Sequence, residues 1–455
     1  MSKATTKKPK QKHPEGLPIV NLHAAGIDVA ASSHMVAVPP DSTADSVREF
    51  GSFTSDLHDI AQWLRDCQVT TVAMESTGVY WRALYLVLIG HGFEVYLVNA
   101  RHVKNVTGKK TDQDDARWIQ KLHSCALLNS SFLPDEDTGR LRTLVRHRNT
   151  LIADCGRYEL RIQKALELMN IKIHSVLSNL MGKTGRAILE AIIGGERAPE
   201  KLMQHIDKRI KADHETIKKS LCGHWKAEEL FLVEQNYTLY KQLHECVAQC
   251  DTNIDELMAR WCAQMPEVVL QKEPAADSTK KQTKKSNKNH PPFSVKEHLH
   301  HIHGVDVTQI YGISELTALR IFSETGADMS KWADEDRFVS WLRLCPNNKV
   351  SAGKVISSMV MKGKAGYASQ AFRQSANALS RSDHWLGDYF RRMRAKGGNK
   401  YAIIAVARKL AIIYYKMVRY KQAFKAVNVD EYREKNKAAK IKYLEKQLAK
   451  IKGAA

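Results

Sequence analysis

The order of strand-like and helix-like segments between residues 19 and 130 constrains the fold of this chain more than any other feature. Apolar, β-branched segments of strand length are residues 19–30, 33–40, 48–54, 70–77 and 93–99. Helical spacing of apolar residues covers 55–67 and 79–92, and a last helix begins near Asp112. Three strands, then two alternations of helix and strand and a final helix, predict a mixed α/β domain.

Four acidic residues occupy particular places in this pattern. Asp28 lies on the first strand and Glu75 at the end of the fourth, while Asp112 and Asp115 share one face at the start of the last helix. A carboxylate at the end of an apolar strand is costly unless it is solvated or paired. Because hard divalent cations prefer oxygen ligands, the four acids predict a site for Mg²⁺ or Mn²⁺ that acts on a phosphodiester.

Each acid also has a simpler explanation. Thr111 and Asp114 have the spacing of a capping box, and acidic residues in a first helical turn complement the helix dipole. Asp28 follows Gly26 and suits a turn, and Glu75 suits a helix entry. The order of the elements favours the metal site, because it is the order of a ribonuclease-H-like domain of the RuvC type.

The charge of the chain points to a polyanionic partner. The 70 Lys and Arg residues exceed the 49 Asp and Glu residues, and the net charge of +21 favours nucleic acid or a membrane surface. No apolar run is long enough to predict a transmembrane helix, and the basic residues 1–18 lack the apolar core of a signal peptide. Eight scattered cysteines suit a reducing cytoplasm, and the spacing of His244, Cys246, Cys250 and Cys262 matches no common zinc module.

The remaining chain divides by composition. The pattern over residues 136–265 predicts long coiled-coil helices that act as a spacer or dimer interface, and the composition of residues 266–292 predicts a lysine-rich disordered linker. A second compact region is expected over residues 293–428, followed by a basic helix or tail over residues 429–455. Residues 1–18 are expected to form a disordered basic arm. The first long helix also has a basic face that is a candidate for nucleic-acid contact: Arg142, Arg146, Arg148, Arg157 and Arg161.

Two motifs stand out in residues 293–428. The segment "IYGIS" (310–314) resembles the turn of a helix-hairpin-helix element, although Ser314 replaces its second glycine. Ser351 follows Pro346 and is followed by two small residues, with Lys349 and Lys354 on either side. A serine in a glycine-containing loop is usually a loop residue, and no neighbouring base is visible to activate it. The residues alone therefore do not assign Ser351 as a nucleophile.

The segments "GIDVA", "AMESTGVYW", "KTDQDDA" and "CPNNKVSAGKV…KGKAG" together resemble the DEDD-type transposases of bacterial insertion sequences, which are bridge-RNA-guided serine recombinases. The resemblance covers nearly the whole chain. It implies that Asp28, Glu75, Asp112 and Asp115 bind Mg²⁺ and that Ser351 is the nucleophile. Two features differ from the family: Ala352 stands where glycine often follows the serine, and the middle section is longer than usual.

The resemblance also implies a mechanism. Ser351 attacks a DNA phosphodiester and forms a transient phosphoserine bond, and the two halves of the site come from different subunits of a tetramer, a dimer of dimers. A structured bridge RNA pairs with donor and target DNA in the bacterial cytoplasm, at the nucleoid. Two alternatives stay open: a RuvC-like, metal-dependent nuclease of the Holliday-junction-resolving type with water as nucleophile, and a catalytically silent RNA-binding scaffold.

Basic residues near these motifs are the expected phosphate contacts. A helix over residues 396–417 is expected to present an apolar face and a cationic edge, although such an edge is as often simply solvated. The nine predicted nucleic-acid-binding residues are Lys110, Arg117, Lys349, Lys354, Lys362, Lys364, Arg373, Lys400 and Arg408.

Overall fold

The computed structural model describes residues 18–76, 78–99, 111–265, 289–360 and 365–452. The chain forms two compact units that divide between Leu133 and Pro134. Nearly all of the expected basic arm and of the lysine-rich linker lies outside the described residues. Within the described part of the chain, no helix is long and apolar enough to cross a membrane.

The described residues of the first unit form a five-stranded sheet with the strand order β3-β2-β1-β4-β5. Strand β2 is antiparallel to β1 and β3, whereas β1, β4 and β5 are parallel. This arrangement confirms the expected mixed α/β character and the expected order of elements. The strands are β1 (Ala24–Val29), β2 (Ser33–Ala37), β3 (Val47–Gly51), β4 (Thr71–Glu75) and β5 (Glu94–Val98), and the helices are α1 (Thr54–Asp66), α2 (Trp81–Gly90) and α4 (Asp112–Ser124).

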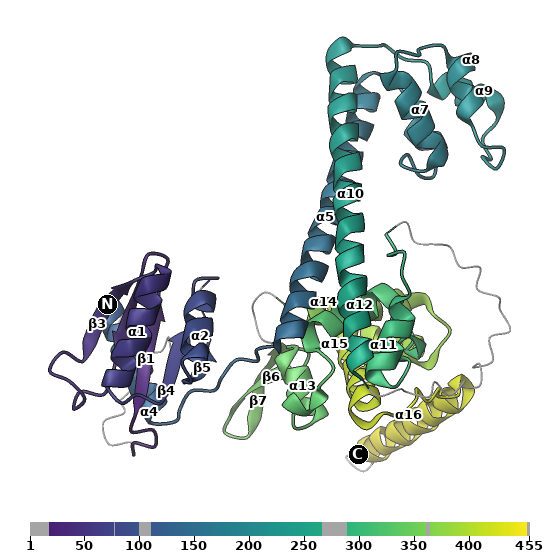
Figure 1. Ribbon diagram of the computed structural model, residues 1–455. Helices are drawn as coiled ribbons and strands as arrows, with labels where there is room; N and C mark the ends of the chain where they lie inside the picture. Colours follow the sequence, from purple (N-terminus) through teal and green to yellow (C-terminus); the bar gives the residue numbers. More distant parts are fainter. Residues whose placement is uncertain (1–17, 77, 100–110, 266–288, 361–364, 453–455) are drawn as a thin grey trace, which may run out of the picture. The chain divides into compact units, whose positions relative to one another are not determined.

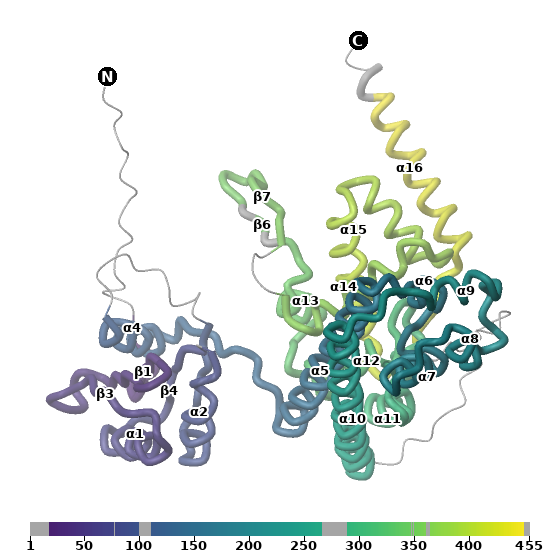
Figure 2. Tube along the Cα trace, turned by 90° about the horizontal axis from the view of Figure 1, so that it is seen from above, coloured from purple at the N-terminus to yellow at the C-terminus, as the bar shows by residue number. Residues whose placement is uncertain are grey.

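The two faces of the sheet are covered by different helices, with α1 and α2 on one side and α4 on the other (Figure 2). Ile27 and Met74 belong to the buried cluster that includes side chains from α1 and α2. Ala73, on the opposite face, packs with Ile119 of α4. Because side chains alternate along a strand, residues 26 and 28 of β1 and residues 73 and 75 of β4 face α4.

Gly26 allows α4 to lie directly on β1. A Cβ atom at this position would come within 2.2 Å of the backbone nitrogen of Gln120 and within 2.6 Å of the carbonyl oxygen of Ala116. Both atoms belong to helix backbone, which cannot move aside as a flexible side chain would. The glycine therefore sets how closely the helix approaches the sheet.

Two long helices, α5 (Glu136–Leu168) and α10 (Ala227–Gln264), run side by side through the second unit (Figure 1). The residues between them form a helical cap at one end of the pair. Its core joins Leu189 and Leu221 of the cap to Ile162 of α5 and Tyr237 of α10. The cap helices are α6 (Ile173–Val176), α7 (Lys183–Ile193), α8 (Pro199–Leu202), the 3₁₀ turn η1 (Met203–His205) and α9 (His214–Ser220).

Several arginines of the expected basic face of α5 form ion pairs with other helices of the second unit. Arg148 is buried and pairs with the buried Asp251 of α10 through both carboxylate oxygens. Arg142 and Arg146 both pair with Glu324, at 3.2 Å and 2.8 Å. All three arginines therefore have partners within the protein, although Arg146 remains 42% exposed, and contact of this face with nucleic acid stays a prediction.

The other end of the helix pair carries the region that contains Ser351. Phe322, Phe338, Phe372 and Tyr414 are fully buried at its centre. Its elements are α11 (Val295–His303), η2 (Val307–Gln309), α12 (Glu315–Thr325), η3 (Met329–Lys331), α13 (Glu335–Trp341), β6 (Pro346–Ser351), β7 (Lys354–Val360), α14 (Tyr367–Ala378), η4 (Leu379–Arg381), α15 (Trp385–Tyr420) and α16 (Val429–Lys452).

One helix in this region differs from its predicted bounds, and Ser314 has a structural role at a helix start. The helix expected over residues 396–417 begins earlier, at Trp385, and is interrupted at Gly398, whose φ of 81° is not helical. Ser314, expected as a weak point of a phosphate-binding turn, is the N-cap of α12, and its hydroxyl accepts a hydrogen bond from the backbone N–H of Thr317. A serine is well suited to this capping role.

Candidate active site

Asp28 and Glu75 lie at the carboxyl ends of two adjacent parallel strands. Ile27 of β1 is paired with Met74 of β4, so the next residue on each strand is one of these acids. Both acids face α4, since they alternate with residues that contact the opposite helices. Glu75 is buried and Asp28 is half-buried. The sheet thus places two carboxylates beside each other on the same face.

Helix α4 runs in the opposite direction to these strands. Near its C-terminal end, His123 Nε2 lies 2.9 Å from the hydroxyl of Thr71, at the start of β4. The side-chain amide of Gln120 donates to the carbonyl oxygen of Ala24, at the start of β1. The N-terminal end of α4 is therefore directed toward the ends of the strands, where Asp28 and Glu75 lie.

The first turn of α4 presents Asp112 and Asp115 toward this end of the sheet. Asp115 is half-buried and precedes Ala116, which is fully buried against the sheet, while Asp112 is exposed. Thr111 is the N-cap, and its hydroxyl accepts from the backbone N–H of Asp114. The capping interaction predicted from the sequence is present alongside the shared face of the other two acids.

Asp114 has different surroundings from the two acids that flank it. It is exposed and its carboxylate accepts a hydrogen bond from the Thr111 hydroxyl at 2.7 Å. Arg117 lies 3.9 Å from its other oxygen. These contacts identify Asp114 as a helix-capping residue within the same turn.

The four acids match a divalent cation in donor chemistry, since all are carboxylates and hard cations prefer oxygen. The fold brings them to one end of the sheet. In the part of the chain that the structure describes, however, no three histidine, cysteine, aspartate or glutamate side chains lie close enough together to hold a metal ion. The described part of the chain thus gathers four carboxylates at one end of the sheet, but does not bring three of them within range of one ion.

Ser351 lies at the tip of a β-hairpin formed by β6 and β7. It is paired with Lys354 across a two-residue turn, Ala352–Gly353. The φ angles of these turn residues are 47° and 75°, and positive values at both positions are those of a type I′ turn. Ser351 and Lys354 are both exposed. The hydroxyl is therefore accessible and has a lysine directly across the turn.

The hairpin also exposes unusual amounts of apolar surface. Val350, Val355, Ile356 and Met359 are between 57% and 70% exposed. The hairpin projects beyond α13 in both views (Figures 1 and 2). A two-stranded hairpin is only marginally stable on its own, so an apolar surface of this kind is suited to a binding partner.

The nine predicted phosphate contacts have different environments. Lys354, Lys400 and Arg117 are exposed. Arg373 is half-buried and donates to the carbonyl oxygen of Arg343, and Arg408 pairs with Asp336 at 2.9 Å, so both have partners within the protein. Lys349 lies on β6, and three further residues lie outside the described part of the chain: Lys110, Lys362 and Lys364.

The sequence prediction missed the hairpin and treated Ser351 as a residue of a glycine-containing loop. A signal was present, because "KVISSMV" is rich in β-branched residues and follows "AG". The prediction also missed the cavity-bearing helical cap at residues 173–220, which has ordinary amphipathic helices and no recognisable motif.

Comparisons with protein families give two matches. Residues 25–171 match the IS110 DEDD transposase family, described as a transposase, and this range contains all four acids. Residues 306–391 match the family described as transposase IS116/IS110/IS902, and this range contains Ser351. No curated protein matches the chain. Two segments of this chain are therefore similar to transposase domains of the IS110 group.

Proposed function

We propose that this protein recombines DNA through a transient phosphoserine bond at Ser351. The observation that carries the proposal is the position of Ser351 at the exposed tip of the β6–β7 hairpin, inside the second transposase match. A hydroxyl at a projecting tip can reach a phosphodiester in a duplex, and Lys354 across the turn supplies positive charge for the phosphate.

The reaction conserves phosphodiester bonds. The oxygen of Ser351 bonds to phosphorus, the ester bond to one DNA strand breaks, and the leaving oxygen takes up a proton as a hydroxyl. A hydroxyl of the exchanged strand then attacks the phosphoserine and regenerates the serine. The number of ester bonds is unchanged, which suits a chain without a phosphate-binding loop of the "GxxxxGK[ST]" type.

Serine is a weak nucleophile and needs activation. We assign this role to the RuvC-like carboxylates Asp28, Glu75, Asp112 and Asp115, which would hold Mg²⁺ or Mn²⁺. Such an ion polarises a phosphate and neutralises charge that develops on its oxygens. The acids belong to the first compact unit and Ser351 to the second. This division supports a site completed by two subunits of a tetramer, as the family resemblance implies.

The partners in this proposal are donor DNA, target DNA and a structured bridge RNA. Base pairing by the RNA would select the sites, so the protein would need mainly contacts to backbone and shape. The net charge of +21 supports the simultaneous binding of several nucleic-acid strands.

The metal site is tested by two charge-neutral substitutions in one helical turn. We expect Asp115→Asn to reduce recombination by at least about 100-fold, because it removes a ligand charge from the end of the sheet. Asp114→Asn is the matched control, since Asp114 is a capping residue. It should keep nearly full activity. Recombination of a defined donor and target pair is measured with purified protein and a Mg²⁺ titration.

Folding and nucleic-acid binding of both variants are measured in parallel, by thermal unfolding and gel shift. Wild-type recombination by Asp115→Asn would contradict the carboxylate site. Equal loss in both variants, with unchanged folding, would show that the charge of the turn matters rather than the position of Asp115.

A further inference from the structure

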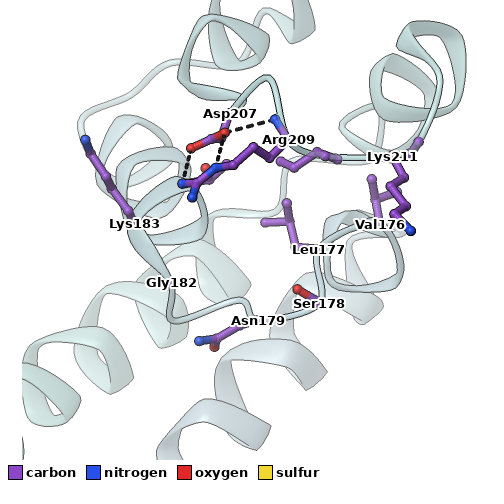
Figure 3. Close-up of a pocket in the computed structure, with 12 residues that line it drawn as sticks. Val176, Leu177, Ser178, Asn179, Gly182, Lys183, Asp207, Arg209 and Lys211 are labelled. Atoms are coloured by element: carbon purple, nitrogen blue, oxygen red, sulfur yellow. Dashed lines mark hydrogen bonds and ion pairs between the residues drawn. The ribbon is translucent and has the colours of Figure 1, made fainter. Parts of the chain in front are cut away.

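A cavity of about 530 Å³ lies in the helical cap, far along the chain from both transposase motifs. Its walls come from two segments, residues 176–184 before and at the start of α7 and residues 207–212 before α9. Figure 3 shows these two segments facing each other across the cavity. Sites for small organic groups have volumes of roughly 300–1,000 Å³, so one such group fits here.

The rim of the cavity is cationic. Lys183 and Lys211 line it at opposite sides (Figure 3). Arg209 is paired with Asp207 through two hydrogen bonds, which lower the pKa of the Asp207 carboxyl. Lys183 also lies near enough to the Asp207 carboxylate to help lower its pKa. Among the described residues, no salt bridge within 4.0 Å involves Lys183 or Lys211, and Arg209 already pairs with Asp207, so the two lysines leave the cavity with excess positive charge.

The start of α7 adds to the positive potential at one side of the cavity. Its N-cap is Gly182, which has no side chain to accept hydrogen bonds from the first helical amides. The positive end of the helix dipole lies at the same place. Together with Lys183, this end of the cavity suits a phosphate.

The other walls of the cavity are apolar. Val176, Leu177, Ile210 and Ala212 line it, and the exposed amide of Asn179 and hydroxyl of Ser178 lie at its edge (Figure 3). A flat aromatic group could lie against this wall while an amide and a hydroxyl offer hydrogen bonds to its rim. A free phosphate ion would leave the apolar wall unused.

We propose that the cavity binds one unpaired nucleotide of a nucleic-acid strand, with its phosphate beside Lys183 and its base against the wall formed by Leu177 and Ile210. Duplex DNA would first have to unpair and unstack a base to fill such a cavity, whereas loops and single strands present unstacked bases to proteins. The inference takes nucleic acid as the partner from the proposed function, but it does not depend on the chemistry at Ser351.

The test compares two double variants of the full-length protein that lose the same charge from the cap. The cavity variant is Lys183→Gln/Lys211→Gln. The control variant is Lys219→Gln/Lys226→Gln, at two exposed lysines that do not line the cavity. Binding is measured by fluorescence anisotropy to a single-stranded RNA, a single-stranded DNA of the same sequence and the corresponding DNA duplex, at several salt concentrations.

We expect the cavity variant to bind the single strands about tenfold more weakly, with the salt slope reduced by about 1, as for one or two lost phosphate contacts. Its affinity for the duplex should change no more than that of the control. A difference between the RNA and DNA arms would identify which strand the cavity prefers. Equal losses in both variants, or equal losses for single strands and duplex, would overturn the proposal.

A second readout does not depend on charge. A single strand with a photoreactive thio-base should crosslink to a peptide that contains residues 176–184 or 207–212. Crosslinks that fall only elsewhere on the chain would also overturn the proposal. A Ser351→Ala background keeps this result separate from strand cleavage, so a failure here leaves the proposed recombination untouched.

Discussion

Ala352 has a left-handed backbone conformation that an L-residue other than glycine adopts at a cost of about 1 kcal/mol. Proteins of the family that this chain resembles often have glycine at this position. The turn geometry provides a physical reason, because both central residues of a type I′ turn have positive φ. The tip that carries Ser351 is thus built with some strain.

We expect Ala352→Gly to stabilise the hairpin by roughly 0.5–1 kcal/mol, and Ala352→Val to destabilise it, because a β-branched residue tolerates positive φ least. Amide hydrogen exchange of residues 346–360 is the appropriate measurement, since the hairpin contributes little to global unfolding. Protection that changes in the same direction for both variants would be inconsistent with the turn geometry.

His123 is the buried titratable residue that links α4 to the sheet. Burial lowers its pKa to about 4 from the usual 6.5. In the unfolded chain the imidazole takes up a proton near pH 6.5, whereas in the folded protein it stays neutral until about pH 4. The contribution of neutral His123 to the free energy of unfolding of the first unit should therefore be fully present above pH 6.5 and should be lost as the pH falls toward 4.

Between pH 7 and pH 5, the protonation of this residue in the unfolded chain should lower the free energy of unfolding by about 2 kcal/mol. It is measured as the pH dependence of hydrogen exchange in peptides from β4 and α4. His34, whose pKa is also lowered by burial, contributes in the same direction. The variant His123→Gln should show a smaller slope than wild type, and an unchanged slope would rule out His123 as its source.

At the scale of elements, buried ion pairs hold the long helices in register. Arg148 and Asp251 join α5 to α10, and Glu324 joins α12 to α5 through two arginines. Removing one partner of a buried pair leaves the other charge without compensation, which costs more than the pair itself contributes.

Asp251→Ala should lower the free energy of unfolding by about 3–5 kcal/mol, because it leaves the Arg148 guanidinium buried without its carboxylate. The double variant Arg148→Met/Asp251→Leu should recover most of this loss. Urea unfolding followed by far-ultraviolet circular dichroism measures both. A double variant no more stable than Asp251→Ala would show that the geometry of the pair, and not the lone charge, determines the cost.

The elements of the first unit were predictable from the sequence because their signals are local. Alternating apolar residues and helical spacing gave the order of strands and helices, and the i, i+3 spacing of Asp112 and Asp115 gave their shared face. Their approach to Asp28 and Glu75 depends on Gly26, whose close contact with α4 has no local signature.

The arginines of α5 show the limit of such reasoning. A basic helix face predicts a polyanion, but Glu324 lies 178 residues beyond Arg146 and only the fold brings them together. The hairpin was missed for a related reason, because Pro346 and Gly353 indicate a loop until the strand pairing is known.

For the whole molecule, the proposed function requires two separate compact units to act on one phosphodiester. The first unit gathers carboxylates at one end of a sheet, and the second carries an exposed serine at the tip of a hairpin. In our account, Mg²⁺ and nucleic acid bring the two together on one phosphodiester. In this proposal, the intermediate is a covalent bond between Ser351 and DNA.

The most direct measurement is a search for that bond. Wild-type protein is incubated with Mg²⁺, bridge RNA and cognate DNA, quenched in denaturant, and mapped by peptide mass spectrometry. We predict a denaturation-resistant adduct on Ser351 that is absent in Ser351→Ala and retained in Ser358→Ala, a matched exposed serine of the same hairpin. An adduct that persists in Ser351→Ala, or cleavage at the wild-type rate without that hydroxyl, would contradict the account and favour a metal-dependent nuclease that uses water.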